Sequence, residues 1–113
     1  MTSRLDPLLV ALGGMVGATL RYAVGVAIAG PPGTLAVNVA GSFVLGVSVT
    51  RIRDPRAQLL LGTGALSSFT TYSTFAVETA TLGGTLGAAN VAATYLFGFL
   101  AAGLGLVAGE VSR

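Results

Sequence analysis

Four long apolar stretches make up most of the chain, at residues 8–29, 34–50, 57–82 and 84–108. Each comes close to the roughly 20 predominantly apolar residues that an α-helix needs to cross a lipid bilayer. We therefore predict an all-α membrane protein with four transmembrane helices, one for each stretch.

The connections between these stretches are short. They read GPPG at 30–33, RIRDPR at 51–56 and GG at 83–84. Glycine and proline at such positions end helices, and arginine favours the membrane surface. We expect consecutive helices to be antiparallel neighbours in one bundle. Residues 1–113 would then form a single transmembrane domain.

The third stretch carries a concentration of hydroxyl side chains in its middle. Residues 67–75 read SSFTTYSTF, which contains six serines and threonines. Ser and Thr side chains compete with helical backbone hydrogen bonds, and a polar run in a bilayer must face protein, water or an ion. We therefore expect the third helix to line a pathway.

Composition excludes several classes of function. Hydrophobic residues make up 53% of the chain and charged residues 9%, and the mean hydropathy is +0.85. The chain has no Cys and no His, which removes disulfides, thiolate nucleophiles, imidazole bases and His-ligated metals. Without a plausible pair of catalytic carboxylates as well, we do not expect an enzyme.

The arginines are distributed unevenly between the two sides of the predicted membrane domain. With four helices, the N-terminus, the second connection and the C-terminus share one side. That side carries Arg4, Arg51, Arg53, Arg56 and Arg113, and only Arg21 lies towards the other. By the positive-inside rule, both termini are expected in the cytoplasm.

Three polar residues within the apolar stretches are candidates for function. Arg21 either snorkels to the interface or joins helices through backbone carbonyls, or it attracts anions towards a vestibule. Glu78 lies beyond the hydroxyl-rich run and is expected at the interface. Asn38 either makes an interhelical hydrogen bond or offers its N–H groups to an anion in transit. No carboxylate lies deep in the first, second or fourth stretch, which disfavours a proton-coupled exporter of the small multidrug resistance type.

Three aromatic residues in the third stretch, Phe69, Tyr72 and Phe75, are spaced to share one helical face. Most such stripes are packing surfaces. However, the edge of an aromatic ring is electropositive, so a ring turned edge-on can also coordinate a small dehydrated anion.

Three motifs resemble the Fluc (CrcB) family of fluoride channels. They are GGMVGATLRY at 13–22, GTLAVNVAGSF at 33–43 and GALSSFTTYSTF at 64–75, the last followed by Glu78. They occur in the family's order, one on each of the first three stretches, and the resemblance extends along essentially the whole chain.

The resemblance implies an architecture and a set of site residues. Subunits of the family have four helices, the third broken near its middle, and pair as antiparallel dimers with two fluoride pathways at the interface. A structural sodium ion lies at the dimer centre, and by position the backbone carbonyls of Ser67 and Thr70 would bind it. The positions that match the family's fluoride pathway are Arg21, Asn38, Tyr72, Ser73, Thr74 and Phe75.

The resemblance also implies a location and a set of partners. The protein would let cytoplasmic fluoride leave passively through a bacterial inner (cell) membrane. Its partners would be fluoride, membrane lipid and a second subunit, and no nucleic acid.

This chain departs from the family pattern in three respects. Tyr72 stands where phenylalanine is common, and Ser67-Ser68 stands where Gly-Gly is common. The arginine bias also suggests a fixed orientation, which an antiparallel homodimer cannot have, so the chain is a candidate for one half of a heterodimer with a related chain. The alternatives left open are a non-conducting or accessory subunit and a small cation exporter.

Overall fold

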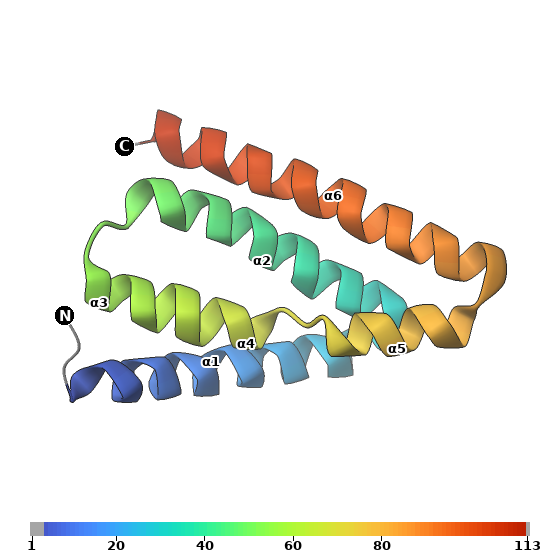
Figure 1. The fold of residues 1–113 in the computed structure, drawn as a ribbon, viewed down its shortest axis with the longest axis horizontal. Coiled ribbons are helices and arrows are strands. Elements are labelled where there is room, and N and C mark those ends of the chain that lie inside the picture. The colour runs from blue at the N-terminus through green and yellow to red at the C-terminus, as the bar shows by residue number, and fades with distance from the viewer. Residues whose placement is uncertain (1–3, 113) are drawn as a thin grey trace.

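The computed structural model describes residues 4–112, which contain helices and no β-strand. The elements, in chain order, are α1 (Leu5–Ala27), α2 (Pro31–Arg51), α3 (Pro55–Gln58), the π-helix η1 (Leu59–Leu66), α4 (Ser67–Phe69), α5 (Ser73–Leu82) and α6 (Gly84–Val111). They form four helical passes, namely α1, α2, the run from α3 to α5, and α6 (Figure 1).

Three of these helices, α1, α2 and α6, are long and apolar enough to cross a membrane. Their bounds lie within three residues of three of the predicted stretches. The remaining predicted stretch, 57–82, falls on the run from α3 to α5, which is divided into shorter elements. The described residues therefore agree with an all-helical protein that has candidate membrane helices.

Glycines with positive φ make two of the tight connections. Gly30 has φ 76° and directly precedes Pro31, whose ring favours the first position of a helix. Gly83 and Gly84, with φ 61° and 49°, turn the chain from α5 into α6. A side chain would strain the backbone at all three positions.

The closest packing joins passes that are not consecutive. Figure 1 shows α2 beside α6, and α1 beside the run from α3 to α4. On α2, Gly46 faces residues 102–106 of α6, and farther along Gly109 meets Thr50, so these two helices run parallel. Consecutive passes are also in contact, as α1 is with α2 and α5 is with α6, but they are not the closest pairs. Hydropathy identifies spans without identifying their closest packing partners in lipid.

Glycines allow these parallel pairs to approach at backbone distance. A Cβ atom on Gly13 would overlap the Leu60 carbonyl oxygen of η1, and one on Gly17 would overlap the Ala65 carbonyl oxygen. The same holds for Gly46 against Ala102. Small residues at helix interfaces are how membrane helices gain van der Waals contact.

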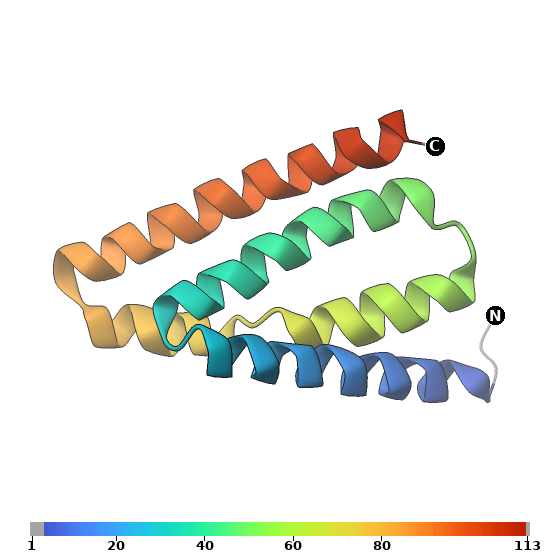
Figure 2. The ribbon, with the colours of Figure 1, turned by 180° about the vertical axis from the view of Figure 1, so that it is seen from behind.

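The arginine-rich connection and both ends of the described chain lie at the same end of the molecule (Figure 2). Here Arg51, the last residue of α2, is bonded to Ser112, which follows α6. Its Nη1 donates to the Ser112 carbonyl oxygen at 3.0 Å and to Ser112 Oγ at 2.7 Å. Arg113 lies outside the described residues.

Candidate functional site

The third pass is interrupted at residues 70–72, in the middle of the hydroxyl-rich run. Helix α4 ends at Phe69, and Thr70 has extended backbone angles of φ −80° and ψ 162°. Helical structure resumes at Ser73, with Tyr72 as the residue that precedes α5. Non-helical backbone at membrane depth needs partners for its peptide groups.

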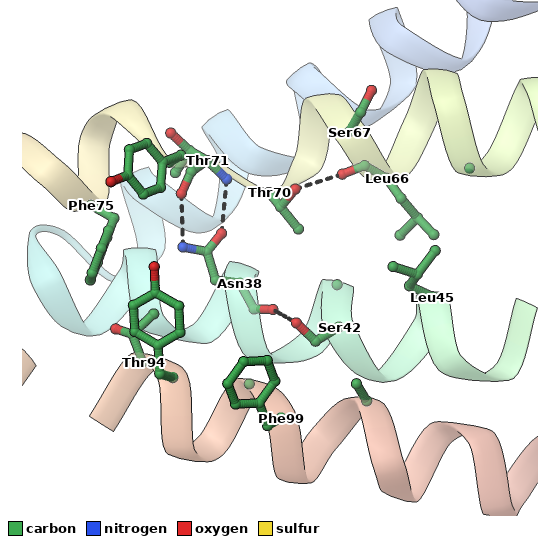
Figure 3. A pocket seen from close by; sticks show the side chains of 16 residues that line it. Asn38, Ser42, Leu45, Leu66, Ser67, Thr70, Thr71, Phe75, Thr94 and Phe99 are labelled. Atoms are coloured by element: carbon green, nitrogen blue, oxygen red, sulfur yellow. Dashed lines mark hydrogen bonds between the residues drawn. The ribbon is translucent and has the colours of Figure 1, made fainter. Parts of the chain in front are cut away.

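Asn38 of α2 supplies those partners for Thr71. Its Nδ2 donates to the Thr71 carbonyl oxygen at 2.9 Å, and its Oδ1 accepts from the Thr71 N–H at 2.8 Å. Figure 3 shows the amide facing the Thr71 backbone with both bonds drawn. Of the two interpretations of Asn38, an interhelical hydrogen bond is therefore present, and the amide keeps one further N–H.

A second side chain satisfies the start of α5. The Thr71 hydroxyl oxygen accepts from the Thr74 N–H at 3.2 Å and lies 3.5 Å from Ser73 Oγ. A side-chain oxygen that accepts from the backbone N–H three residues later in the chain is a typical cap of a helix N-terminus.

Several other hydroxyls in the run bond to their own helix. Ser67 Oγ donates to the Thr63 carbonyl oxygen, and Thr70 Oγ1 donates to the Leu66 carbonyl oxygen at 2.9 Å. On α2, Ser42 Oγ donates to the Asn38 carbonyl oxygen at 2.8 Å. These three hydroxyls satisfy local carbonyls, which keeps polar side chains compatible with an apolar bundle.

A cavity of about 500 Å³ opens beside the interruption, between α2, the third pass and α6 (Figure 3). Three of the predicted fluoride-pathway positions, and both residues of the predicted sodium site, line the cavity. Those lining it are Asn38, Ser67, Thr70, Tyr72 and Phe75.

A row of aromatic rings follows this cavity from the third pass onto α6. The centroid of Phe75 lies 5.8 Å from that of Tyr72 and 6.1 Å from that of Tyr95, which it meets edge-to-face at 83°. Tyr95 in turn lies 5.9 Å from Phe99. Phe75 is 7% exposed, whereas Tyr72 is 72% exposed.

Sequence reasoning missed Tyr95 and Phe99. Aromatic side chains on a long apolar helix are typical of lipid contact or packing, and neither residue belongs to the motifs singled out above. The spacing of four between them, which places them on one helical face, was the available signal. Phe69 does not line the cavity. The interruption at 70–72 puts Phe69 and Phe75 on separate helices, so the single helical face predicted for them with Tyr72 does not form.

A second cavity, of about 450 Å³, lies on the α1 side of the interruption and contains Arg21, Thr74 and Glu78. Glu78 Oε1 is buried and has no hydrogen-bond partner. Thr71 lines both cavities, so the interruption separates them. Ser73 lines neither and is exposed.

The described residues contain no cluster of three or more His, Cys, Asp or Glu that could hold a metal ion. Neutral oxygens, from backbone carbonyls, hydroxyls and the Asn38 amide, are the cation ligands that the interruption offers. Two carbonyls there, those of Ser67 and Thr70, have lost their usual helical donors, because the Thr71 and Thr74 N–H groups bond to side-chain oxygens instead. Carbonyl oxygens suit a hard cation.

This arrangement defines a small multi-pass membrane protein whose polar interrupted pass lies between two cavities. The family profile described as "CrcB-like protein, Camphor Resistance (CrcB)" matches residues 8–109. The chain belongs to this family, as its three motifs predicted.

Known relatives are similar over most of their length. "Fluoride-specific ion channel FluC 2" of Halobacterium salinarum is 58% identical over 97 residues, which cover 80% of this chain and 76% of the relative. "Fluoride-specific ion channel FluC 1" of Natronomonas pharaonis is 50% identical over 112 residues, covering 93% and 92%. The protein of the same name from Haloarcula marismortui is 51% identical over 110 residues, covering 93% and 84%. The family is one of ion channels and not of enzymes.

Proposed function

We propose that this chain is a subunit of a fluoride-selective channel through which cytoplasmic fluoride leaves the cell passively. The observation that carries the proposal is the Asn38-supported interruption, with a row of aromatic rings on one side and Arg21 on the other. The names of the relatives support fluoride as the transported ion.

Fluoride is small and strongly hydrated, so a channel must replace its water with other positive contacts. Electropositive ring edges at Tyr72 and Phe75 and the remaining N–H of Asn38 would serve on the side of the first cavity. Arg21 would draw anions into the second cavity. Ser73 and Thr74 would provide hydroxyls between the two.

No coupling residue is needed for export. At a membrane potential that is negative inside, expulsion of one anion gains about 2.3 kcal/mol per 100 mV. A passive channel is therefore sufficient, provided that it excludes the more abundant chloride. We place the protein in the cell membrane with both termini in the cytoplasm, in accordance with the arginine-rich end.

We further propose that the functional unit is an antiparallel dimer with the third helix broken and two pathways at the interface. Much of the aromatic row is uncovered in a single subunit, with Tyr72 72% and Phe99 73% exposed. A second subunit placed over this face would enclose the cavity and exclude lipid from it, which supports an interface at this position.

A structural sodium ion at the dimer centre fits the residues that are present. The carbonyls of Ser67 and Thr70 would hold it, since their helical donors bond elsewhere. When bound, the ion supplies a fixed positive charge that satisfies carbonyls at the break and joins the two subunits.

The arginine bias favours a specific form of this dimer, in which a related chain of opposite orientation is the partner. Arg4 directly precedes α1, Arg51 ends α2, and Arg53 and Arg56 follow it, whereas Arg21 lies in the second half of α1. An antiparallel homodimer would require half of the copies to insert against the positive-inside rule.

Fluoride efflux from liposomes, followed with a fluoride electrode, tests the proposal. We expect rapid release of fluoride, no release from chloride-loaded vesicles, and loss of fluoride release in Phe75→Ile, which assembles normally. If the chain alone is silent but conducts with a related chain of opposite charge bias, the channel is a heterodimer. Absence of fluoride flux from well-folded protein in both experiments overturns the proposal.

A further inference from the structure

Two backbone N–H groups at the interruption bond to side chains where an uninterrupted helix would use carbonyls. The Thr71 N–H would donate to the Ser67 carbonyl four residues earlier, and it donates instead to Asn38 Oδ1 at 2.8 Å. The Thr74 N–H would donate to the Thr70 carbonyl, and it donates instead to Thr71 Oγ1 at 3.2 Å.

As a result, the two redirected backbone donors at the interruption have partners, and two of its backbone acceptors have none among the described residues. Side-chain oxygens satisfy the two redirected N–H groups, whereas the corresponding carbonyls are left as unused acceptors. The carbonyl of the next peptide group, that of Thr71, is itself occupied by Asn38 Nδ2 at 2.9 Å. The break therefore presents free carbonyl oxygens at Ser67 and Thr70, while the N–H groups of Thr71 and Thr74 are already bonded to side chains. A cation requires oxygen ligands of this kind.

We infer that Asn38 and Thr71 are positioning residues for a cation site formed by the Ser67 and Thr70 carbonyls. Neither side chain is a ligand. Asn38 Oδ1 and Thr71 Oγ1 act by keeping competing N–H donors away from the carbonyls. The inference rests on the proposed function only in taking a cation to occupy that position.

Asn38 then serves both ions. The same amide that lines the first cavity also bonds to the N–H and the carbonyl of Thr71. An Asn38 substitution that lowers fluoride flux is therefore not by itself proof of a contact with fluoride, and its effect on the cation site must be measured separately.

A matched pair of substitutions at Thr71 isolates this role. Thr71→Val keeps the β-branched shape and the backbone bonds to Asn38, but it removes the oxygen that accepts from Thr74. Thr71→Ser keeps that oxygen and serves as the control. Asn38→Leu, of similar shape, removes the acceptor for the Thr71 N–H and tests the other half of the inference.

The measurement is the thermal midpoint of the purified full-length protein in detergent, titrated with sodium at constant ionic strength, with N-methylglucamine as the replacement cation. Sodium that binds only the folded dimer raises this midpoint, and the concentration at half effect reports its affinity. We expect that concentration to rise about fivefold in Thr71→Val and Asn38→Leu, because each variant frees one backbone N–H group to bond to a carbonyl in competition with sodium. We expect it to be unchanged in Thr71→Ser.

Two results would overturn the inference. If Thr71→Val lowers the midpoint equally at every sodium concentration, the hydroxyl is only a helix cap. If the wild-type protein does not respond to sodium, there is no such cation site to position. Fluoride efflux from the wild-type protein is a separate measurement from these thermal midpoints. Failure of the cation-site inference therefore leaves the test of the channel proposal unaffected.

Discussion

The Asn38 side-chain amide forms a pair of hydrogen bonds with the carbonyl and the N–H of Thr71, at 2.9 and 2.8 Å, between residues 33 positions apart. The pair joins α2 to the interrupted third pass at the boundary between the two cavities. One side chain thus meets both backbone polar groups of a residue that has left its helix. This explains how the interruption persists in an apolar bundle before any ion or second subunit is considered.

Asn38→Ala should destabilise the protein more than loss of an ordinary interhelical hydrogen bond does. The substitution leaves both the N–H and the carbonyl of Thr71 without partners, and we expect a loss of about 1–3 kcal/mol in the free energy of unfolding. Asn90→Ala is the matched control, because Asn90 Nδ2 donates a single bond, at 2.9 Å, to Thr79 Oγ1.

Reversible unfolding in mixed micelles, followed by circular dichroism, compares the two variants. We expect the Asn90 variant to lose about 1 kcal/mol or less, in the range of single hydrogen bonds between membrane helices. Equal losses in the two variants would contradict a special role for the Asn38–Thr71 pair.

Hydropathy was sufficient to predict the helical spans, because the length of an apolar run is a local property. The hydroxyl-rich run also marked the position of the interruption, since six Ser and Thr residues in a lipid environment need other partners. The partner itself could not be predicted. The sequence offers several polar residues, and only the packing of α2 against the third pass selects Asn38 for Thr71.

The aromatic row could be predicted only in part for the same reason. Tyr72 and Phe75 belong to the recognised motif, whereas Tyr95 joins them because α6 packs against the third pass and α2. In lipid, apolar residues carry little information about which helix they face. The preference of α2 for α6 over its neighbour in sequence was not predicted either.

Tyr95→Leu should reduce fluoride flux even though Tyr95 lies outside the motif. Its ring meets Phe75 edge-to-face at 83° and 6.1 Å, an arrangement that holds the Phe75 ring in a defined orientation. Without it, Phe75 is free to adopt other rotamers, and we expect efflux from liposomes to fall by about tenfold.

Two further variants give this experiment its controls. Tyr95→Phe keeps the ring and should conduct nearly as well as the wild-type protein. Phe97→Leu alters an aromatic residue that lies on the same helix but does not line the cavity, so it should leave efflux unchanged. Equal loss in the Tyr95 and Phe97 leucine variants would indicate general disruption of α6.

Gly17→Ala should destabilise the packing of α1 on η1. A Cβ atom at Gly17 would overlap the Ala65 carbonyl oxygen, and backbone cannot move aside as a flexible side chain can. We expect about 1–3 kcal/mol of destabilisation from this overpacking.

Gly25→Ala on the same helix is the control for Gly17→Ala. A Cβ atom there would meet nothing within 4 Å, and alanine is the better helix former by about 1 kcal/mol. The Gly25 variant should therefore be neutral or slightly stabilised when unfolding is followed by circular dichroism. Similar losses in the two variants would contradict a tight α1–η1 contact.

Arg21→Gln should slow fluoride efflux by lowering the positive potential of the second cavity, which also contains Thr74 and Glu78. A charge that gathers anions acts on their local concentration, so its effect shrinks as salt screens it, with a Debye length of about 30 Å at 0.01 M and about 10 Å at 0.1 M. We therefore expect a several-fold loss of flux at low ionic strength and a smaller loss at high ionic strength.

Arg53→Gln removes the same charge at a position that lines none of the cavities described, and it should leave flux unaffected at both ionic strengths. A loss in Arg21→Gln that does not depend on salt would show that Arg21 acts by contact or by packing. A steering role and a local role are thus separated by one titration of ionic strength, with sodium gluconate as a salt whose anion is too large to enter the pathway.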